Sequence, residues 1–318
     1  MKCRFCHNEL THVFIDLVNA PPSNSFLTKE QLNEPEVFFP LRLYVCDKCF
    51  LVQIDEYKKS DDIFNQNYAY FSSFSTSWLE HAKKYVDMIT ELLQLSTMSH
   101  VMEIASNDGY LLQYFVQKQI SCLGIEPSSN TAQAAREKGV DTLEEFFGAE
   151  FAKRLVQEGK KADLIIGNNV LAHVPDINDF VSGLKIALKN RGVVTMEFPH
   201  LMRLIEENQF DTIYHEHFSY LSFHIVRRIF AEHGLVLFDV EELPTHGGSL
   251  RIYARHDEDD LKSVTANVAA LLEKEASEGM LQLNYYLDFQ QKADQVKYAL
   301  LTFLLEQKEQ GKKVVAYG

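Results

Sequence analysis

Four consecutive residues, Tyr214, His215, Glu216 and His217, bring together a phenol, a carboxylate and two imidazoles. Imidazole is the only side chain whose unperturbed pKa lies near neutrality, which makes it the usual general base or acid in enzymes. A general base beside a hydroxyl donor can remove a proton and stabilise the negative charge that develops. The cluster therefore predicts acid–base chemistry. The alternatives are a structural hydrogen-bond cluster and an adventitious metal site.

The cysteines form a second pattern with chemical meaning. Cys3 and Cys6 make one Cys-x-x-Cys pair, Cys46 and Cys49 make another, and Cys122 stands alone. Two such pairs complete the tetrahedral four-thiolate set of a structural zinc site, which leaves no open position for catalysis. A redox-active pair is the alternative, and it is disfavoured because both pairs fall in one short region. We expect a small β-rich lobe closed by Zn²⁺, and Cys122 in a buried strand.

The elements that must position these residues alternate from residue 99 onward, as in parallel βαβ units. The expected strands are 101–105, 121–125, 140–143, 162–167, 193–198, 235–240 and 250–254. The expected helices are 111–118, 130–138, 151–158, 180–188 and 225–233. The last two strands are separated only by a loop, so they should form a hairpin at the end of an otherwise parallel sheet. The pattern predicts an α/β, doubly wound sheet, and the hairpin is typical of methyltransferases that use S-adenosylmethionine (SAM).

A turn of small and polar residues follows the first of these strands, where a ligand can approach the backbone at a helix N-terminus. The second strand ends in Glu126, about 20 residues further on, where an acidic side chain can accept both hydroxyls of a ribose. The turn has no G-x-G-x-x-G pattern, and Asp108 would repel a phosphate. A nucleoside without a phosphate, such as SAM, is therefore favoured. The alternative is a structural acidic residue at a strand end.

Length and composition exclude other classes of protein. The chain has 318 residues, which predicts about two domains, and its 46% hydrophobic and 24% charged residues are ordinary for a globular protein. A net charge of −14 argues against a cationic face for nucleic acid polymers. The chain has neither an apolar run of about 20 residues nor an N-terminal signal peptide. We expect a cytoplasmic protein that binds neither nucleic acid polymers nor membranes, and the oligomeric state stays open.

The sequence resembles the sugar C-methyltransferases, which methylate a carbon of nucleotide-linked ketosugars. Residues 103–109 and 124–128 resemble the cofactor motif of this family. The four-cysteine lobe also matches, as do the stretches 70–73, 168–173, 214–220 and 245–251. The resemblance covers essentially the whole chain. It departs at Ala105, where family members usually carry glycine, an exchange that a backbone outside the left-handed region would accept.

This resemblance implies catalytic roles for six residues. His217 would be the general base, Tyr214 an oxyanion donor or orienting group, and Glu216 a residue that helps to set the histidine. Asn169 and His173 follow the fourth strand and would border the transferred methyl group. Tyr68 would reach in from the segment before the core, although it could also pack a domain junction, and His173 could instead cap a helix. The remaining histidines, His200 among them, show no such grouping.

Further residues are implied for binding. Those for the cofactor are Glu103, Ala105, Ser106, Asn107, Asp108, Gly109, Glu126, Pro127 and Asn168. Those for the substrate are Tyr70, Ser72, His246, Gly247, Gly248 and Arg251. The glycines around His246 predict a turn. A plain hairpin loop is therefore the alternative to a substrate contact there.

The last part of the chain predicts helices from Leu261 to Gln310, divided at Gly279, and then a buried strand and turn over 312–318. In the resembled family a further Rossmann-like domain begins at such a Val-Ala-Tyr-Gly. We therefore expect a chain that is truncated at the start of that domain. The expected division is a zinc lobe at 1–66, a methyltransferase core at 67–258, a helical linker at 259–311 and the first residues of the further domain at 312–318.

Together with these observations, the resemblance implies a SAM-dependent C-methyltransferase that acts on a nucleotide-diphosphate 4-ketosugar, with C3 as the expected carbon. Removal of the proton next to the ketone would leave an enolate, whose carbon attacks the methyl group. One alternative is a SAM-dependent O- or N-methyltransferase of a small metabolite with the same sheet. A second is a non-catalytic binding module that contains zinc.

Overall fold

A computed structural model describes residues 1–57, 64 and 68–316. Its centre is a seven-stranded sheet in the order β10-β11-β8-β7-β4-β5-β6. These strands are β4 (His100–Ile104), β5 (Ser121–Ile125), β6 (Thr142–Leu143), β7 (Ala162–Asn168), β8 (Leu188–Pro199), β10 (Leu235–Leu243) and β11 (Ser249–His256). The strands from β6 to β8 are parallel, whereas β11 pairs antiparallel with β8 and with β10. The predicted doubly wound sheet that ends in a hairpin is confirmed.

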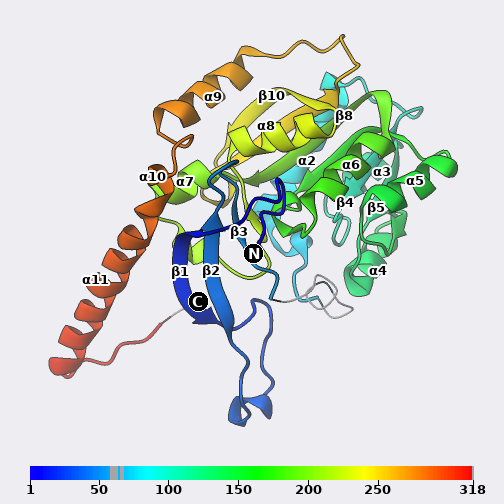
Figure 1. Cartoon of the computed structure of the whole chain (residues 1–318). Helices are drawn as coiled ribbons and strands as arrows, with labels where there is room; N and C mark the ends of the chain where they lie inside the picture. The colour runs from blue at the N-terminus through cyan, green and yellow to red at the C-terminus, as the bar shows by residue number, and fades with distance from the viewer. Residues whose placement is uncertain (58–63, 65–67, 317–318) are drawn as a thin grey trace.

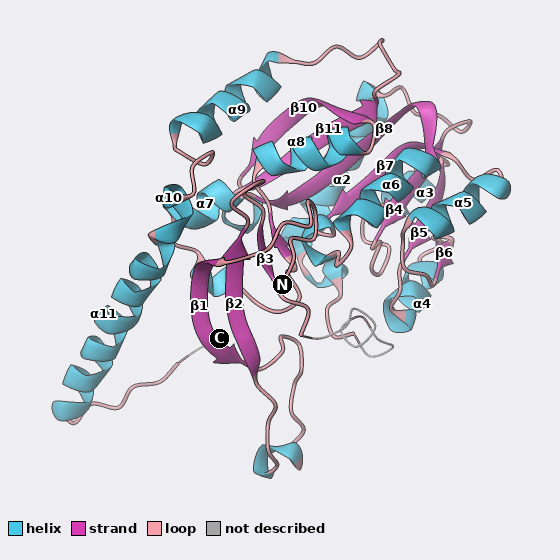
Figure 2. Ribbon diagram, viewed as in Figure 1, coloured by secondary structure: helices cyan, strands magenta, loops and turns pink. Residues whose placement is uncertain are grey.

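Helices cover both faces of this sheet (Figure 2). On one face, α2 (Thr76–Leu92), α3 (Leu112–Gln117) and α4 (Ser129–Glu137) bury residues such as Ala82, Phe115 and Ala135. On the other, α5 (Ala149–Gln157), α6 (Ile177–Ala187) and α8 (Phe223–Glu232) bury residues such as Leu155 and Leu184. Two helices were not expected from the sequence, namely α2 and the short α7 (Leu201–Glu206). α2 begins at Ser75, whose hydroxyl accepts a hydrogen bond from the backbone N–H of Trp78 (3.2 Å).

The cysteine lobe is a small antiparallel sheet in the order β1-β2-β3-β9. Its first three strands are β1 (His12–Ala20), β2 (Phe39–Val45) and β3 (Val52–Ile54). The fourth strand, β9 (Ser219–Tyr220), comes from the second half of the chain. The loop between β1 and β2 carries the short η1 (Gln31–Asn33) and extends away from the body of the molecule (Figure 1). The expected β-rich lobe is confirmed, but it is completed by a strand from the methyltransferase region.

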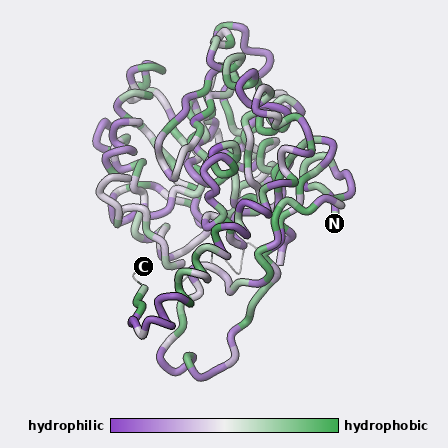
Figure 3. The backbone as a smooth tube through the Cα atoms, turned by 90° about the vertical axis from the view of Figure 1, so that its left-hand side faces the viewer, coloured by the Kyte–Doolittle hydropathy of each residue, from purple (hydrophilic) through white to green (hydrophobic). Residues whose placement is uncertain are grey.

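The tail consists of α9 (Ala266–Ser277), α10 (Asn284–Leu287) and α11 (Phe289–Glu309). α9 ends before Gly279, which has a φ of 95° and divides the helical run as expected. The start of α11 packs on the cysteine lobe through stacked Phe14 and Phe289, whose ring centroids lie 4.8 Å apart. The rest of α11 extends outward (Figure 1, Figure 3). None of the described helices is long and apolar enough to cross a membrane.

The expected buried strand at 312–318 is wrong over its described part. Residues 312–316 are exposed and form no strand. A strand needs partners for its backbone groups, and no described strand lies beside this segment. Tyr317 and Gly318, the rest of that prediction, lie outside the described residues.

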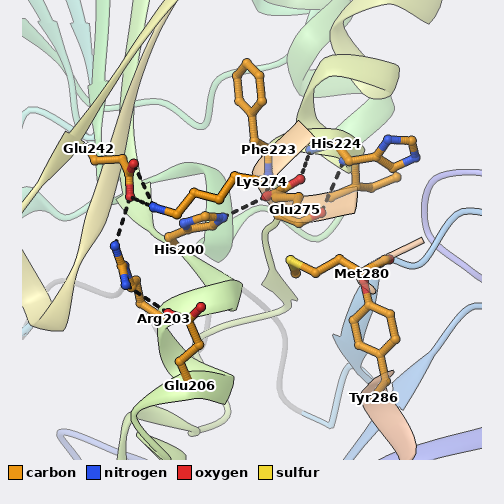
Figure 4. Close-up of polar contacts among 12 residues, drawn as sticks. His200, Arg203, Glu206, Phe223, His224, Glu242, Lys274, Glu275, Met280 and Tyr286 are labelled. Atoms are coloured by element: carbon orange, nitrogen blue, oxygen red, sulfur yellow. Dashed lines mark hydrogen bonds and ion pairs between the residues drawn. The ribbon is translucent and has the colours of Figure 1, made fainter. Parts of the chain in front are cut away.

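A buried carboxylate connects the tail to the core. Glu275 of α9 accepts hydrogen bonds from the backbone N–H groups of Phe223 (2.6 Å) and His224 (2.7 Å), at the N-terminus of α8. It also accepts one from Nε2 of His200 (2.7 Å), as Figure 4 shows. A carboxylate at a helix N-terminus is stabilised by the unpaired N–H groups and by the helix dipole. Glu275 therefore fixes α9 against α8 and against the end of β8.

Candidate active site

The cysteine cluster fits a metal ion. The Sγ atoms of Cys3, Cys6, Cys46 and Cys49 all lie within 4.8 Å of one another, and three of the pairs are 3.6 Å apart. A tetrahedral site with Zn–S bonds of 2.3 Å has its sulfurs about 3.8 Å apart, so the spacing suits four thiolates around one ion. The side-chain amide of Gln53 donates to Cys3 Sγ (3.3 Å), a contact that stabilises a thiolate. The predicted ligand set is thus brought together.

A first cavity, of about 190 Å³, opens at the carboxyl ends of β4, β5 and β7. Ligands of doubly wound sheets bind at this edge, because the turns after neighbouring parallel strands meet there. Five of the nine expected cofactor residues line it, namely Ala105, Asn107, Glu126, Pro127 and Asn168. We refer to it as the cofactor cavity.

Glu126 is the fixed anion of the cofactor cavity. Its Oε2 accepts the backbone N–H of Asn107 (2.9 Å) and its Oε1 accepts that of Ser128 (2.9 Å). Burial raises the pKa of Glu126, and these two backbone donors oppose that effect. Oδ1 of Asn107 accepts a hydrogen bond from the backbone N–H of Ser72 (2.8 Å). This contact holds the segment before α2 against the turn that follows β4. The carboxylate is therefore pre-oriented in the way that binding of two ribose hydroxyls requires.

The other four expected cofactor residues build the turn and do not line the cavity. Glu103 is fully buried, its carboxyl oxygens have no hydrogen-bond partner among the described residues, and burial raises its pKa well above the usual range. Asp108 pairs with Lys138 (2.9 Å), so its charge is compensated and the expected repulsion of a phosphate is weakened. Gly109 has a φ of 73°, and a Cβ there would lie 3.1 Å from the Cβ of Ala135. Ser106 is buried against Gly124 of β5.

Ala105 lines the cofactor cavity, but the condition under which alanine was expected to replace glycine without strain is not met. Its φ is 55°, in the left-handed region, where the methyl group of alanine is accommodated less readily than glycine. A Cβ in this region lies too close to the following carbonyl oxygen, at a cost of about 1–2 kcal/mol. Asn107 and Asn169, at 49° and 54°, share the conformation, which asparagine adopts more readily. Three residues at the edge of the cofactor cavity thus have left-handed backbone conformations, of which Ala105 carries the largest cost.

A second cavity, of about 470 Å³, adjoins the first. All six expected catalytic residues line it, namely Tyr68, Asn169, His173, Tyr214, Glu216 and His217. We call it the catalytic cavity. Tyr68, Tyr70, Asn169 and His173 line both cavities and form their shared wall. A group in the catalytic cavity would therefore meet a group of the cofactor across this wall.

His217 and Tyr214 form a hydrogen-bonded pair in the catalytic cavity. Nδ1 of His217 lies 3.3 Å from the carbonyl oxygen of Thr212, which can only accept, so Nδ1 carries the hydrogen. Nε2 is then the acceptor for the hydroxyl of Tyr214, at 2.8 Å. Burial and the neighbouring His173 lower the pKa of His217 well below its usual value, and burial raises the pKa of Tyr214. At neutral pH the pair is a neutral imidazole with a free-base nitrogen and a protonated phenol.

Glu216 does not orient His217, contrary to the expectation. Oε1 of Glu216 instead accepts hydrogen bonds from the hydroxyl of Ser23 (2.7 Å) and the amide of Asn24 (3.0 Å), in the loop after β1. Thr212 and Tyr214 orient the histidine, as described above. Sequence reasoning missed Ser23 and Asn24, because nothing local connects them with a residue more than 190 positions away. The only signal was the Pro21-Pro22-Ser23-Asn24 turn itself.

The expected substrate residues are spread more widely. Tyr70 belongs to the shared wall, Ser72 lines the cofactor cavity and His246 lines the catalytic cavity. Gly247 and Gly248 line an open groove on the other side of the turn. Arg251 lies outside both cavities, because its guanidinium pairs with Glu197 (3.0 Å) and Glu241 (3.2 Å). His200, which the sequence did not single out, does line the catalytic cavity.

Comparisons with known proteins agree along the whole chain. Residues 3–64 match a family model described as a zinc binding domain, residues 78–240 one described as a methyltransferase domain, and residues 244–318 one described as a C-methyltransferase C-terminal domain. The C-methyltransferase NovU of Streptomyces niveus is 32% identical over 317 residues, which cover 100% of this chain and 75% of that protein.

Solved structures are similar at lower identity. One is magnesium protoporphyrin IX methyltransferase from Synechocystis with bound SAM. It is 16% identical, with a TM-score of 0.41, and the matched region covers 56% of this chain and 80% of that protein. Another is a SAM-dependent methyltransferase from Clostridium acetobutylicum. It is 11% identical, with a TM-score of 0.45, and the matched region covers 56% of this chain and 92% of that protein.

Proposed function

Because this chain belongs to the C-methyltransferase family, we propose that it transfers the methyl group of SAM to a carbon of a nucleotide-diphosphate 4-ketosugar, at C3. The 32% identity with NovU over the full chain supports C-methylation. The sugar acceptor is supported by the motifs around Tyr70, Asn169, His217 and His246. All four of these residues line the catalytic cavity.

The observation that carries the proposal is the His217–Tyr214 pair. Methylation of carbon requires a carbanion equivalent, which a base produces by removing the proton next to a ketone. A neutral imidazole with its Nε2 lone pair on the cavity side suits that step, and a phenol hydroxyl suits the oxygen on which charge develops. A simple transfer to an exposed amine would need neither group.

The two cavities supply the rest of the arrangement. SAM, when bound, supplies an electrophilic methyl group. Glu126 and Asn168 are the residues we assign to hold it, on the cofactor side of the shared wall. Tyr68, Asn169 and His173 separate the two cavities and would restrict the acceptor carbon to one approach. Burial lowers the pKa of His217 and so keeps its imidazole neutral.

In the proposed reaction the C3 proton passes to Nε2 of His217, and the electron pair of the broken C–H bond forms the enolate. The hydroxyl hydrogen of Tyr214 rotates about the C–O bond from His217 to the ketone oxygen and stabilises the negative charge there. Carbon C3 would then form its bond to the methyl group as the S–CH₃ bond of the sulfonium breaks, with that electron pair left on the sulfur of the departing S-adenosylhomocysteine and the ketone restored. The proton held by His217 returns to solvent.

The test combines turnover with solvent exchange. Mass spectrometry of SAM turnover against a panel of nucleotide ketosugars should find one acceptor whose mass rises by one methyl group. In D₂O, the acceptor carbon should exchange its proton. His217→Asn should reduce exchange and turnover by about 100-fold or more, as expected for loss of a general base, with SAM binding by calorimetry unchanged.

The alternative outcomes separate the rival functions. A methylated product without proton exchange at carbon would indicate O- or N-methylation. Exchange that persists in His217→Asn would assign the base to another residue. Absence of SAM binding would favour a non-catalytic module.

A further inference from the structure

The cysteine lobe holds the segment that carries the proposed catalytic residues. We define the catalytic loop as residues 214–220. Its last two residues form β9 and pair with β3 of the lobe, Ser219 opposite Gln53 and Tyr220 opposite Val52. One residue earlier, the carbonyl oxygen of Phe218 accepts the backbone N–H of Ile54 (3.2 Å). The lobe therefore fixes the carboxyl-terminal end of this loop by regular strand pairing.

Side chains on either side of Glu216 are held by the lobe as well. Nε2 of His215 lies 3.2 Å from the carbonyl oxygen of Pro40, at the start of β2. The guanidinium of Arg4 lies 5.3 Å from the ring centre of Phe218, and the same group donates to the carbonyl oxygen of Ile54 (2.6 Å). The side chains of His217 and Tyr214 take no part in these contacts and line the catalytic cavity.

Glu216 links the cysteine lobe to the catalytic cavity, because its carboxylate binds two residues of the lobe and also lines the cavity. Its side chain is buried, and a buried carboxylate is stable only with hydrogen-bond donors. Both donors, Ser23 Oγ at 2.7 Å and Asn24 Nδ2 at 3.0 Å, bind the same oxygen, Oε1. Within the described part of the chain, Oε2 has no partner, and Glu216 lines the catalytic cavity. The remaining acceptor is thus available to a ligand there.

The loop that provides the two donors is pre-organised. Pro21 and Pro22 fix two successive φ angles just after β1, which lowers the entropy that the loop loses on ordering. Asn24 has a φ of 57°, a conformation that suits asparagine. Asn24 also lines the catalytic cavity. The turn therefore places the side chains of Ser23 and Asn24 at Glu216.

We propose that the cysteine lobe is a positioning element of the active site, in which Ser23 and Asn24 hold Glu216 so that Oε2 accepts a hydroxyl group of the sugar acceptor. The inference rests on the proposed function, since it names the group that a sugar would offer. The acceptor would then be fixed at two places, its ketone side at Tyr214 and His217 and a hydroxyl at Glu216. Ser23 and Asn24 act through Glu216 and are positioning residues.

The experiment is a double-mutant cycle on turnover. Ser23→Ala and Asn24→Ala are made alone and together, each in the wild-type chain and in the Glu216→Gln background. Loss of a hydrogen bond to a charged group predicts a fall in kcat/KM for the acceptor of about tenfold or more for each single variant. In the Glu216→Gln background the same changes should alter kcat/KM by less than about twofold, because the carboxylate they hold is gone.

Controls separate positioning from loss of fold. Ser25→Ala, an exposed residue next in the chain, should match wild type in turnover, and all variants should retain SAM affinity by calorimetry. Equal losses in both backgrounds would overturn the inference, because a merely structural loop adds its effect to that of Glu216. A wild type that turns over no ketosugar would overturn the proposed function and this inference with it. If the wild type turned over a ketosugar normally and the Ser23 and Asn24 variants matched it, the inference would be overturned while the proposed function would stand.

Discussion

The cofactor cavity and the catalytic cavity share four residues but are built in different ways. The cofactor cavity is formed mainly by the turns after three neighbouring strands of one sheet, and its anion, Glu126, is held by backbone N–H groups of its own surroundings. The catalytic cavity draws on the lobe loop at Asn24, the end of β8 at His200, the loop around His217 and the turn at His246. Binding of SAM should therefore depend mainly on the turns of the sheet and on the segment before α2 that covers them, whereas transfer should also depend on the lobe and the tail.

Removal of the metal is the largest test of this difference. Structural zinc sites of this kind contribute about 10–16 kcal/mol to folding in isolated zinc-finger peptides, so loss of the ion should unfold the lobe. The catalytic loop would lose β3 and the partners of Glu216, and methyl transfer should fall below detection. Affinity for SAM should stay within about threefold. Zinc release by a chromogenic chelator, calorimetry with SAM and turnover measure the three quantities.

Two cysteine variants provide the matched pair. Cys46→Ser removes one ligand of the cluster and should reproduce the effect of chelation. Cys122→Ser changes a thiol in β5, outside the cluster, and should leave zinc content and turnover near wild type. If chelation weakened SAM binding as much as turnover, the two cavities would not be independent.

Glu275 tests whether the tail also supports the catalytic side. Glu275→Ala leaves three donors without an acceptor, namely the buried N–H group of Phe223, the partly buried N–H group of His224 and the buried Nε2 of His200. We expect the free energy of unfolding to fall by about 3–5 kcal/mol, measured by chemical denaturation. Because His200 lines the catalytic cavity, turnover should fall as well, at a temperature where the variant is folded, while SAM affinity is retained.

The control for Glu275 is Glu273→Ala. Glu273 lies on the same helix and is exposed, so its removal should change the free energy of unfolding by no more than about 0.5 kcal/mol. Similar stabilities of the two variants would show that the buried contacts of Glu275 contribute little.

The same contrast explains what the sequence could predict. The seven strands and most of the helices around them have clear periodicity, and the four cysteines are paired by spacing, so these features could be identified locally. Tyr214 and His217 lie three residues apart, and their contact is local too. Glu126 follows a strand at the expected distance from the first turn. The cofactor side is built mostly from such local signals.

The parts that could not be predicted depend on contacts between distant segments. Ser23 and Asn24 contact Glu216 from more than 190 positions away, and β9, which pairs this part of the chain with β3, has two residues, too few for any periodicity. His200 gains its role from Glu275, 75 positions further on. Arg251 shares a motif with His246, but side chains alternate along a strand, and it points to Glu197 instead.

Glu126→Gln tests whether a change in the cofactor cavity weakens SAM binding without affecting the catalytic cavity. The carboxamide NH₂ would face one of the two backbone N–H donors that now bind the carboxylate, and the charge would be lost. Loss of one hydrogen bond to a charged group, about 1.5–3 kcal/mol, predicts a dissociation constant for SAM that is about 10-fold to 100-fold higher. Proton exchange at the acceptor carbon should stay within about twofold, because the His217–Tyr214 pair is untouched.

Glu144→Gln is the matched control, since Glu144 is an exposed residue that pairs with Arg136 (2.6 Å) and lines neither cavity. Its SAM affinity should equal that of wild type. A Glu126→Gln variant that lost proton exchange as well would contradict the separation of the two cavities.

The smallest effect concerns the strained turn of the cofactor cavity. Ala105 has a φ of 55°, and its Cβ costs about 1–2 kcal/mol in this conformation. Glycine removes that cost but loses about 0.5–1 kcal/mol through the greater freedom of the unfolded chain. Ala105→Gly should therefore raise the free energy of unfolding by up to about 1 kcal/mol, which thermal and chemical denaturation can detect.

The expected direction of this change makes the test informative, because substitution of alanine by glycine normally lowers the free energy of unfolding. Ala152→Gly, in the interior of α5 where no left-handed residue occurs, should lower the free energy of unfolding by about 1 kcal/mol. Two identical substitutions would thus act in opposite directions, at a buried helical alanine and at a partly exposed left-handed one. SAM affinity should not fall in Ala105→Gly, because the turn keeps its shape without the methyl group. If both variants were destabilised equally, the strain would not lie at Ala105, and the cofactor cavity would be as relaxed locally as the helices behind it.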